Sequence, residues 1–118
     1  MIKVDVCIIT YNRLESLRHL LEGLDALVFN KKPKPCLNII VIDNDPKGSA
    51  RQVVHTFALK CVWPVHYYIE SNRGIPQARN RAIKEARSDT NFIAFIDDDE
   101  IPAPQWLDEL IYIQNNLI

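Results

Sequence analysis

Four short apolar runs constrain the fold of this 118-residue chain more than any other feature of the sequence. They cover residues 4–9, 37–42, 65–69 and 92–96, and polar or turn-forming residues follow each of them. Between the runs, apolar residues recur at helical spacing, which predicts strands alternating with helices. Such alternation is typical of a parallel sheet with helices on both faces. We therefore expect an α/β fold, a three-layer sandwich in which a mostly parallel sheet of about four strands is flanked by helices.

Cap and proline signals locate the starts of the expected helices. Asn12 followed by Glu15 resembles a capping box for the first helix, and Ser49 offers a cap for the second. Pro76 suits the first turn of the third helix, and Pro104 opens the fourth. The expected inward-facing residues are Leu14, Leu17, Leu21, Leu24 and Val28 in the first helix, Ala78, Ala82, Ile83 and Ala86 in the third, and Trp106, Leu107, Leu110 and Ile111 in the fourth.

Composition indicates a soluble globular domain without a strongly charged partner. The chain is 47% apolar and 25% charged, and its net charge of −1 gives no electrostatic attraction to nucleic acid or membranes. Cys7, Cys36 and Cys61 lack the spacing of a metal site, so we expect reduced, buried thiols. Neither a signal peptide nor an apolar run of membrane-spanning length is recognisable. We therefore expect a cytoplasmic protein, with any contact to a membrane surface made by parts outside these residues.

The last apolar run leads directly into four consecutive acids, Asp97, Asp98, Asp99 and Glu100. Open α/β sheets bind their ligands at the carboxyl ends of the strands. Two carboxylates ~5 Å apart repel by ~3 kcal/mol at an effective dielectric constant of ~20, so a cluster of this kind favours a bound cation. Oxygen ligands without a nearby His or Cys suit Mg²⁺ or Mn²⁺. The alternative is a solvated acidic turn that caps the next helix.

Polar residues also follow the first two runs, with Thr10, Tyr11 and Asn12 after the first and Asp43 after the second. Because parallel strands end on the same side of a sheet, these residues should share one edge with the acids. If the first and fourth strands are neighbours, the crevice between them is the natural nucleotide site. Glycine occurs only at positions 23, 48 and 74, so neither a Rossmann fingerprint nor a P-loop is present. A phosphate would be held through a metal and side chains.

Four short motifs span almost the whole chain in a fixed order. They are VCIITYNR at residues 6–13, VIDN at 41–44, NRG at 72–74 with ARN at 78–80, and FIDDD at 95–99. Together they resemble the family 2 glycosyltransferases of the GT-A fold. The resemblance implies that residues 1–118 are a single domain, the N-terminal, nucleotide-sugar-binding half of such an enzyme, apparently truncated.

The resemblance also implies a role for the motifs at the nucleotide. Thr10 and Tyr11 would line the base, and Asp43 would accept a hydrogen bond from a base N–H such as that of uracil. Arg79 would reach the base or the diphosphate, and the loop at residues 72–74 would border the same pocket.

The acidic run would be the DXD motif of the family. Asp97 would meet the ribose or the sugar, and Asp99 would coordinate the metal, although three successive aspartates leave this register open by one residue. The implied nucleotide-binding residues are Thr10, Tyr11, Asn12, Arg13, Asp43, Asn72, Gly74, Arg79, Asp97 and Asp98, and the implied metal ligands are Asp97 and Asp99.

The residue types leave plainer roles open at several of these positions. Asp43 equally suits a turn, and Thr10 and Asn12 suit helix caps. Arg79 suits a solvated helix surface. The three histidines have no acidic or Cys partner at ligand spacing, and we expect them to be structural. We expect the two tryptophans to be packing residues, with the alternative that a tryptophan near the acids borders a sugar.

The implied reaction is transfer of a sugar from a nucleotide-diphospho-sugar, a UDP-sugar in the first place, to an acceptor hydroxyl with inversion and with Mn²⁺ or Mg²⁺ as cofactor. Synthesis of a cell-envelope polysaccharide fits this reaction. The family places its carboxylate base and acceptor site in the second half of the catalytic domain, so the base is unknown here and we expect the isolated fragment to be inactive. The alternative is a non-catalytic module that binds a nucleotide-sugar or a metal.

Two other classes of protein are disfavoured, and association is predicted. A receiver domain would have its acidic pair after the first strand, and a sugar nucleotidyltransferase would have a glycine-rich loop there.

A chain that stops at Ile118 would leave one side of the strand at residues 92–96 unpaired and the apolar face of the last helix uncovered. We therefore expect self-association, most simply as a twofold homodimer.

Overall fold

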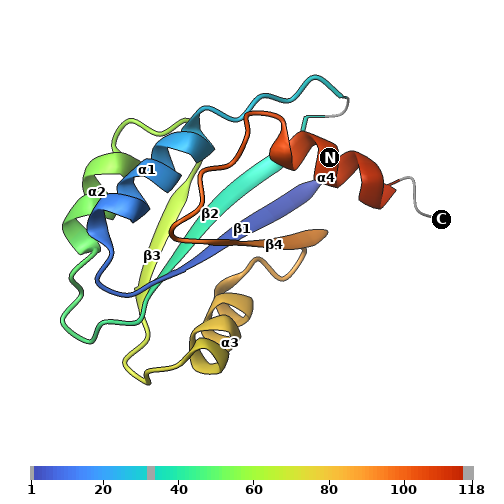
Figure 1. The fold of residues 1–118 in the computed structure, drawn as a ribbon. Coiled ribbons are helices and arrows are strands. Elements are labelled where there is room, and N and C mark those ends of the chain that lie inside the picture. Colours follow the sequence, from blue (N-terminus) through green and yellow to red (C-terminus); the bar gives the residue numbers. More distant parts are fainter. Residues whose placement is uncertain (1, 32–33, 116–118) are drawn as a thin grey trace.

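The computed structural model describes residues 2–31 and 34–115, in which four parallel strands alternate with four helices (Figure 1). The predicted α/β class is confirmed, and each predicted strand agrees with the structure to within one residue at either end. In chain order the elements are β1 (Lys3–Thr10), α1 (Leu14–Asp25), β2 (Cys36–Asp43), α2 (Arg51–Ala58), β3 (Val65–Ile69), α3 (Ile75–Glu85), β4 (Phe92–Asp97) and α4 (Trp106–Asn115).

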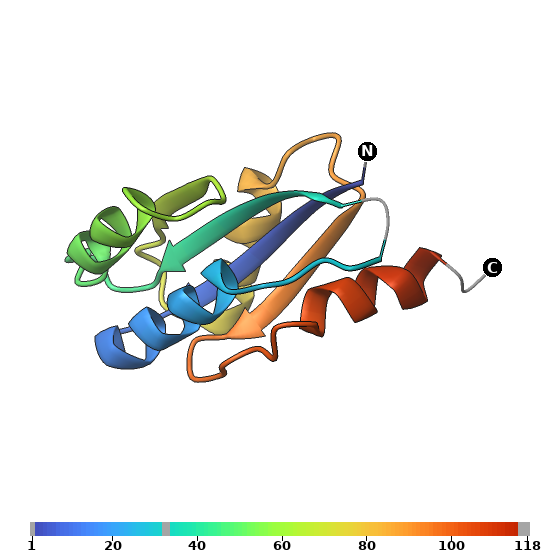
Figure 2. The ribbon, with the colours of Figure 1, turned by 90° about the horizontal axis from the view of Figure 1, so that it is seen from above.

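The sheet has two differently covered faces because successive side chains of a strand point to opposite sides. Val4, Val6 and Ile8 of β1 are buried in the larger core cluster, to which α1, α2 and α4 contribute. The other face carries Cys7, and of the four described helices only α3 covers it, with its small residues Ala78 and Ala82 fully buried. Figures 1 and 2 show α3 on the opposite side of the sheet from the other three helices.

The strand order is β3-β2-β1-β4, so the first and last strands of the chain are neighbours. Ile9 of β1 pairs with Asp97 of β4, and Thr10 pairs with Asp43 of β2 on its other side. The carboxyl ends of β1, β2 and β4 therefore meet at one edge, as the sequence predicted. Within the described part of the chain, β3 and β4 are the two edge strands.

The first two helices begin later than the cap signals predicted. Arg13 is the N-cap of α1 without a side-chain hydrogen bond, so the predicted capping box of Asn12 and Glu15 is wrong. Asn12 instead takes a left-handed backbone conformation, with φ of 52°. The helix ends at Asp25, and Val28 therefore lies beyond it and is exposed.

Ser49 does not cap α2, because the helix begins one residue later behind Ala50. The buried carboxylate of Asp43 accepts a hydrogen bond from the Ala50 N–H at 2.9 Å and satisfies a donor at this helix start. A strand residue thus replaces the predicted local cap.

The third and fourth helices confirm part of the predicted packing. Pro76 lies in the first turn of α3, but Ile83 is 53% exposed, so its predicted burial is wrong. In α4, Leu107 and Ile111 are buried in the core, whereas Leu110 is exposed. The prediction that this face loses its cover is therefore wrong for Leu107 and Ile111.

The three cysteines are free, with Cys7 buried and the other two half-buried. In residues 2–31 and 34–115, no helix combines the length and the apolar character that a membrane crossing requires.

Candidate functional site

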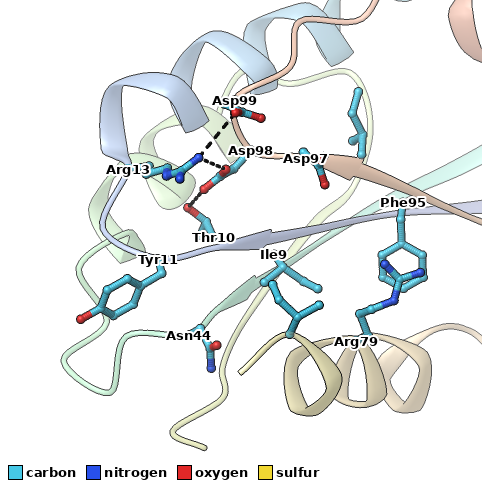
Figure 3. A pocket seen from close by; sticks show the side chains of 12 residues that line it. Ile9, Thr10, Tyr11, Arg13, Asn44, Arg79, Phe95, Asp97, Asp98 and Asp99 are labelled. Carbon is cyan, nitrogen blue, oxygen red and sulfur yellow. Dashed lines mark hydrogen bonds and ion pairs between the residues drawn. The ribbon is translucent and has the colours of Figure 1, made fainter. Parts of the chain in front are cut away.

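A cleft of about 340 Å³ opens where β1 and β4 end beside the start of α3 (Figure 3). It brings together seven of the predicted site residues, which are Thr10, Tyr11, Arg13, Arg79, Asp97, Asp98 and Asp99. Its remaining lining residues are Ile9, Asn44, Ile75, Phe95 and Ile96. The cleft thus joins segments that are almost ninety residues apart in the sequence, because β1 and β4 are neighbours in the sheet.

Asp98 is the buried member of the acidic run and is held from two sides. Its Oδ2 accepts a hydrogen bond from the Thr10 hydroxyl at 3.0 Å, and its Oδ1 lies 3.4 Å from Nη1 of Arg13. Burial raises the pKa of the Asp98 carboxyl, and the Thr10 hydrogen bond and the Arg13 charge oppose this shift. Asp97 and Asp99 are exposed. The structure therefore separates one fixed carboxylate from two that are accessible.

The acids form a tight turn and do not cap a helix. The Glu100 N–H donates to the carbonyl oxygen of Asp97, and the Asp97 N–H donates to the Glu100 carboxylate, both at 3.1 Å. Helix α4 begins only at Trp106. The alternative prediction that this turn caps the next helix is therefore wrong.

Two arginines stack on aromatic rings at the cleft. The guanidinium of Arg79, on α3, lies 4.2 Å from the ring centroid of Phe95 and lines the cleft. The guanidinium of Arg73 lies 3.7 Å from the ring centroid of Tyr11. Since cation–π contacts fix a guanidinium over a ring, both contacts restrict where these charges can lie.

Asp43 lies outside the cleft lining and is fully buried. Its Oδ1 accepts the Asp45 N–H at 3.0 Å, and its Oδ2 accepts the Ala50 N–H at 2.9 Å and the Tyr67 hydroxyl at 2.6 Å. These bonds give Asp43 the turn-forming role that the sequence left open. Its contact with a nucleotide base stays a prediction.

Asn44 is a lining residue that the sequence analysis did not assign. Its backbone N–H donates to the Thr10 carbonyl at 2.8 Å, and its side-chain NH₂ donates to the carbonyls of Glu70 and Asn72 at 2.8 and 3.0 Å. Its Oδ1 accepts the Gly74 N–H at 3.0 Å. Asn44 therefore ties the ends of β1 and β2 to the loop before α3. In the sequence it was the last residue of the VIDN motif, and a local motif carries no information about hydrogen-bond partners so far along the chain.

The other predicted residues lie around the cleft without lining it. Asn72 and Gly74 belong to the loop that Asn44 holds, and Gly74 has φ of 134°, a conformation that favours glycine. Asn12 is exposed at the end of β1. A nucleotide role for these three residues stays a prediction.

The donor atoms at the cleft suit a hard divalent cation. Asp97 and Asp99 offer carboxylate oxygens, and His and Cys are absent from the lining. Within the described residues, no group of three or more His, Cys, Asp or Glu side chains is arranged to hold a metal ion. Mg²⁺ commonly binds one or two protein carboxylates and completes its shell with substrate phosphates and water. The two exposed aspartates fit a metal of that kind.

Comparison with known sequences decides the family. The model of the glycosyl transferase family 2 matches residues 5–116. The chain belongs to the family 2 glycosyltransferases. It is 33% identical to the succinoglycan biosynthesis protein ExoM of Rhizobium meliloti (strain 1021) over 92% of this chain and 33% of that protein.

Two solved structures share the fold of this family 2 chain. TarS 1–349 of S. aureus in complex with UDP-GlcNAc superposes with a TM-score of 0.79 at 23% identity, covering 98% of this chain and 32% of that one. The mannosyltransferase PcManGT from Pyrobaculum calidifontis, in complex with GDP-Man and Mn²⁺, gives 0.77 at 21% identity, covering 92% and 31%. The predicted GT-A half domain is confirmed. The chain spans about a third of the length of each of these relatives.

Proposed function

We propose that this chain binds the nucleotide and the metal of a nucleotide-diphospho-sugar, whose sugar is transferred to an acceptor hydroxyl. The observation that carries the proposal is the cleft itself, in which Tyr11 and Arg79 line the same cavity as the accessible carboxylates of Asp97 and Asp99. Family membership supports a donor of this class. The ligands of the two structural relatives, UDP-GlcNAc and GDP-Man with Mn²⁺, support it further.

The cleft offers a chemically suitable side chain to each part of the donor. The ring of Tyr11 offers a stacking surface for a base, and the Arg79 guanidinium offers positive charge to the base or the diphosphate. Asp97 and Asp99 would hold Mn²⁺ or Mg²⁺ against the diphosphate. Such a metal, when bound, offsets the negative charge that develops on the leaving diphosphate. We propose that the nucleotide is UDP. Asp43 would accept a hydrogen bond from the base N–H after a local rearrangement that exposes its carboxylate.

We further propose that the sugar is transferred with inversion. An inverting transfer needs a carboxylate base within hydrogen-bond reach of the acceptor hydroxyl. The cleft carboxylates are assigned to the metal and to the Thr10 and Arg13 contacts, so we expect these 118 residues to bind the donor without transferring its sugar. The likeness to a succinoglycan biosynthesis protein favours an acceptor in polysaccharide synthesis.

Calorimetry with UDP, with and without Mn²⁺, tests donor binding. We expect UDP to bind only with the metal, and Asp99→Asn to weaken this binding at least about tenfold, because a carboxylate–metal contact is lost. Asp89→Asn is the matched control, since Asp89 is an exposed aspartate outside the cleft. Binding that survives a chelator, or that Asp99→Asn leaves unchanged, contradicts the metal role. Asp43→Ala should weaken UDP binding while leaving its metal dependence intact.

A binding module without catalysis is the second candidate, and the commitment of the cleft carboxylates to donor-side contacts favours it. A transferase assay with a UDP-sugar tests whether these 118 residues are inactive, as both candidates expect. Sugar transfer by these 118 residues that is abolished by mutating one of their carboxylates would establish an enzyme and contradict the expected inactivity.

We also propose association through the β4 edge. Among the described strands, β4 pairs with β1 alone, and a groove of about 250 Å³ runs between it and α4. An edge strand presents unpaired backbone N–H and C=O groups to another chain. A twofold dimer should therefore appear in light scattering of this chain, and a monodisperse monomer would contradict it.

A further inference from the structure

Arg13 connects the start of α1 to the acidic turn after β4. Its carbonyl accepts the Leu17 N–H at 2.9 Å, which fixes its backbone to the first turn of the helix. Its side chain reaches the turn after β4, where Nη1 lies 3.4 Å from Oδ1 of Asp98 and 3.6 Å from Oδ2 of Asp99 (Figure 3). Among residues 2–31 and 34–115, Arg13 is the one cation that pairs with either aspartate.

The two contacts of Arg13 differ in how easily they can be exchanged. Asp98 is buried and has the Thr10 hydroxyl at its second oxygen, so it stays fixed without Arg13. The side chain of Asp99 is 58% exposed and has the longer contact with Arg13. Because water surrounds both members of an exposed pair, that pair is weak and another cation can take the place of the guanidinium.

We propose that Arg13 is a built-in counter-cation, which competes with the divalent metal for Asp99 and thereby makes metal binding depend on the nucleotide. The inference rests on the proposed metal role of Asp99. A guanidinium and a divalent ion a few ångströms apart repel each other, so Arg13 lowers the affinity of the cleft for the metal alone. When a diphosphate is bound, Arg13 no longer lowers the affinity for the metal, because the negative charge of the diphosphate attracts the guanidinium and the metal together. The metal and the donor therefore enter as one complex.

Titration with Mn²⁺ alone, followed by the electron paramagnetic resonance signal of free Mn²⁺, tests this proposal on the 118-residue chain. We expect Arg13→Gln to raise the affinity for Mn²⁺ roughly two- to fivefold, the range that the loss of an exposed ion pair allows. Arg13→Lys keeps the charge and should stay within about twofold of the wild-type protein. Arg18→Gln is the matched control, because Arg18 pairs with Glu15 on the exposed side of the same helix.

A second titration, with UDP in the presence of Mn²⁺, tests whether Arg13 favours binding once the diphosphate is present. Arg13→Gln should weaken UDP binding, although it strengthens the binding of the metal alone. Arg13→Gln that binds Mn²⁺ no more tightly than the wild-type protein, or the absence of Mn²⁺ binding in every variant, overturns the inference. Failure of the wild-type protein to bind UDP with Mn²⁺ overturns the proposed function instead, and the titrations with Mn²⁺ alone still decide the role of Arg13.

Discussion

The guanidinium of Arg87 binds the carboxylate of Asp5, which is fully buried in β1. Arg87 donates from Nε to Oδ1 and from its backbone N–H to Oδ2, both at 2.9 Å. Its Nη2 also donates to the carbonyls of Val4 and Cys36, at 2.9 and 3.0 Å. One side chain thus joins β1, β2 and the segment between α3 and β4, at the end of the sheet opposite the cleft.

Replacing Arg87 by Ala should destabilise the fold by about 3 to 5 kcal/mol, because it leaves a buried carboxylate without its counter-charge. Urea unfolding followed by circular dichroism measures this loss. Asp89→Ala, which removes an exposed ion pair with Lys3, should leave the unfolding midpoint unchanged. A loss of less than about 1 kcal/mol for Arg87→Ala would place this pair among weak surface pairs.

Replacing Tyr67 by Phe should destabilise the fold by about 1 to 3 kcal/mol at neutral pH, because the buried Asp43 carboxylate loses a hydroxyl donor. Tyr68→Phe is the matched control, since the neighbouring Tyr68 packs on the face covered by α3. Equal unfolding midpoints for the two variants would contradict this role of Tyr67.

The Tyr67 hydroxyl should also make the free energy of unfolding depend on pH in the alkaline range. Burial raises the pKa of Tyr67 above its ordinary value of 10.0, and the hydrogen bond to Asp43 adds to the rise. Above pH 10 the unfolded chain loses this proton more readily than the folded one, so the free energy of unfolding should fall as the pH rises. Below pH 10 both states keep the proton. The stability difference between Tyr68→Phe and Tyr67→Phe should therefore shrink above pH 10, and a constant difference would count against the shift.

The thiols of Cys7 and Cys61 should react slowly with iodoacetamide in the folded protein. Burial raises the pKa of Cys7 to about 12 and that of Cys61 to about 11, so few thiolates are present at pH 8. Alkylation of Cys61 should accelerate about tenfold per pH unit between pH 8 and 10, while Cys7 stays protected by its burial. Mass spectrometry of the labelled chain separates the two sites, and rapid labelling of Cys7 without denaturant would contradict its burial.

Asn44→Ala should loosen the loop before α3, because three side-chain hydrogen bonds are lost. We expect faster amide hydrogen exchange at residues 70–74 and a dissociation constant for UDP with Mn²⁺ that rises by at least about threefold, since each lost bond is worth ~1 kcal/mol. Asn91→Ala is the control, because its side chain accepts a bond from the Lys3 N–H far from the cleft. Unchanged exchange at residues 70–74 would show that other contacts hold the loop.

The strands were predictable from the sequence because each is a dense apolar run bounded by polar residues. The strand order could be predicted only on the condition that the first and fourth strands are neighbours, since periodicity does not show which strands pair. The start of α3 was predicted because proline at the first turn acts locally, as at Pro76. The start of α1 was not, because Asn12 adopts a left-handed conformation that a capping pattern does not reveal.

The residues of the cleft were predictable to the extent that they sit at strand ends. Thr10, Asp97 and Asp99 line it as the parallel topology requires. The roles of Asn44 and Arg87 were not predictable, because their hydrogen bonds reach partners 26 to 83 residues away in the sequence. The hydrogen bond from Thr10 to Asp98 likewise selects one aspartate of three as the fixed one, a choice that three identical neighbours cannot reveal.

The hydrogen bond between Thr10 and Asp98 spans 88 positions of the sequence. During synthesis the first strand leaves the ribosome long before the fourth, so the cleft cannot exist until nearly all of these residues have emerged and β4 has docked beside β1. Contacts so distant in sequence form slowly, because the chain between them must first be ordered. A donor bound across both strand ends would stabilise only the completed sheet, and its binding would report that the sheet formed by these residues has folded.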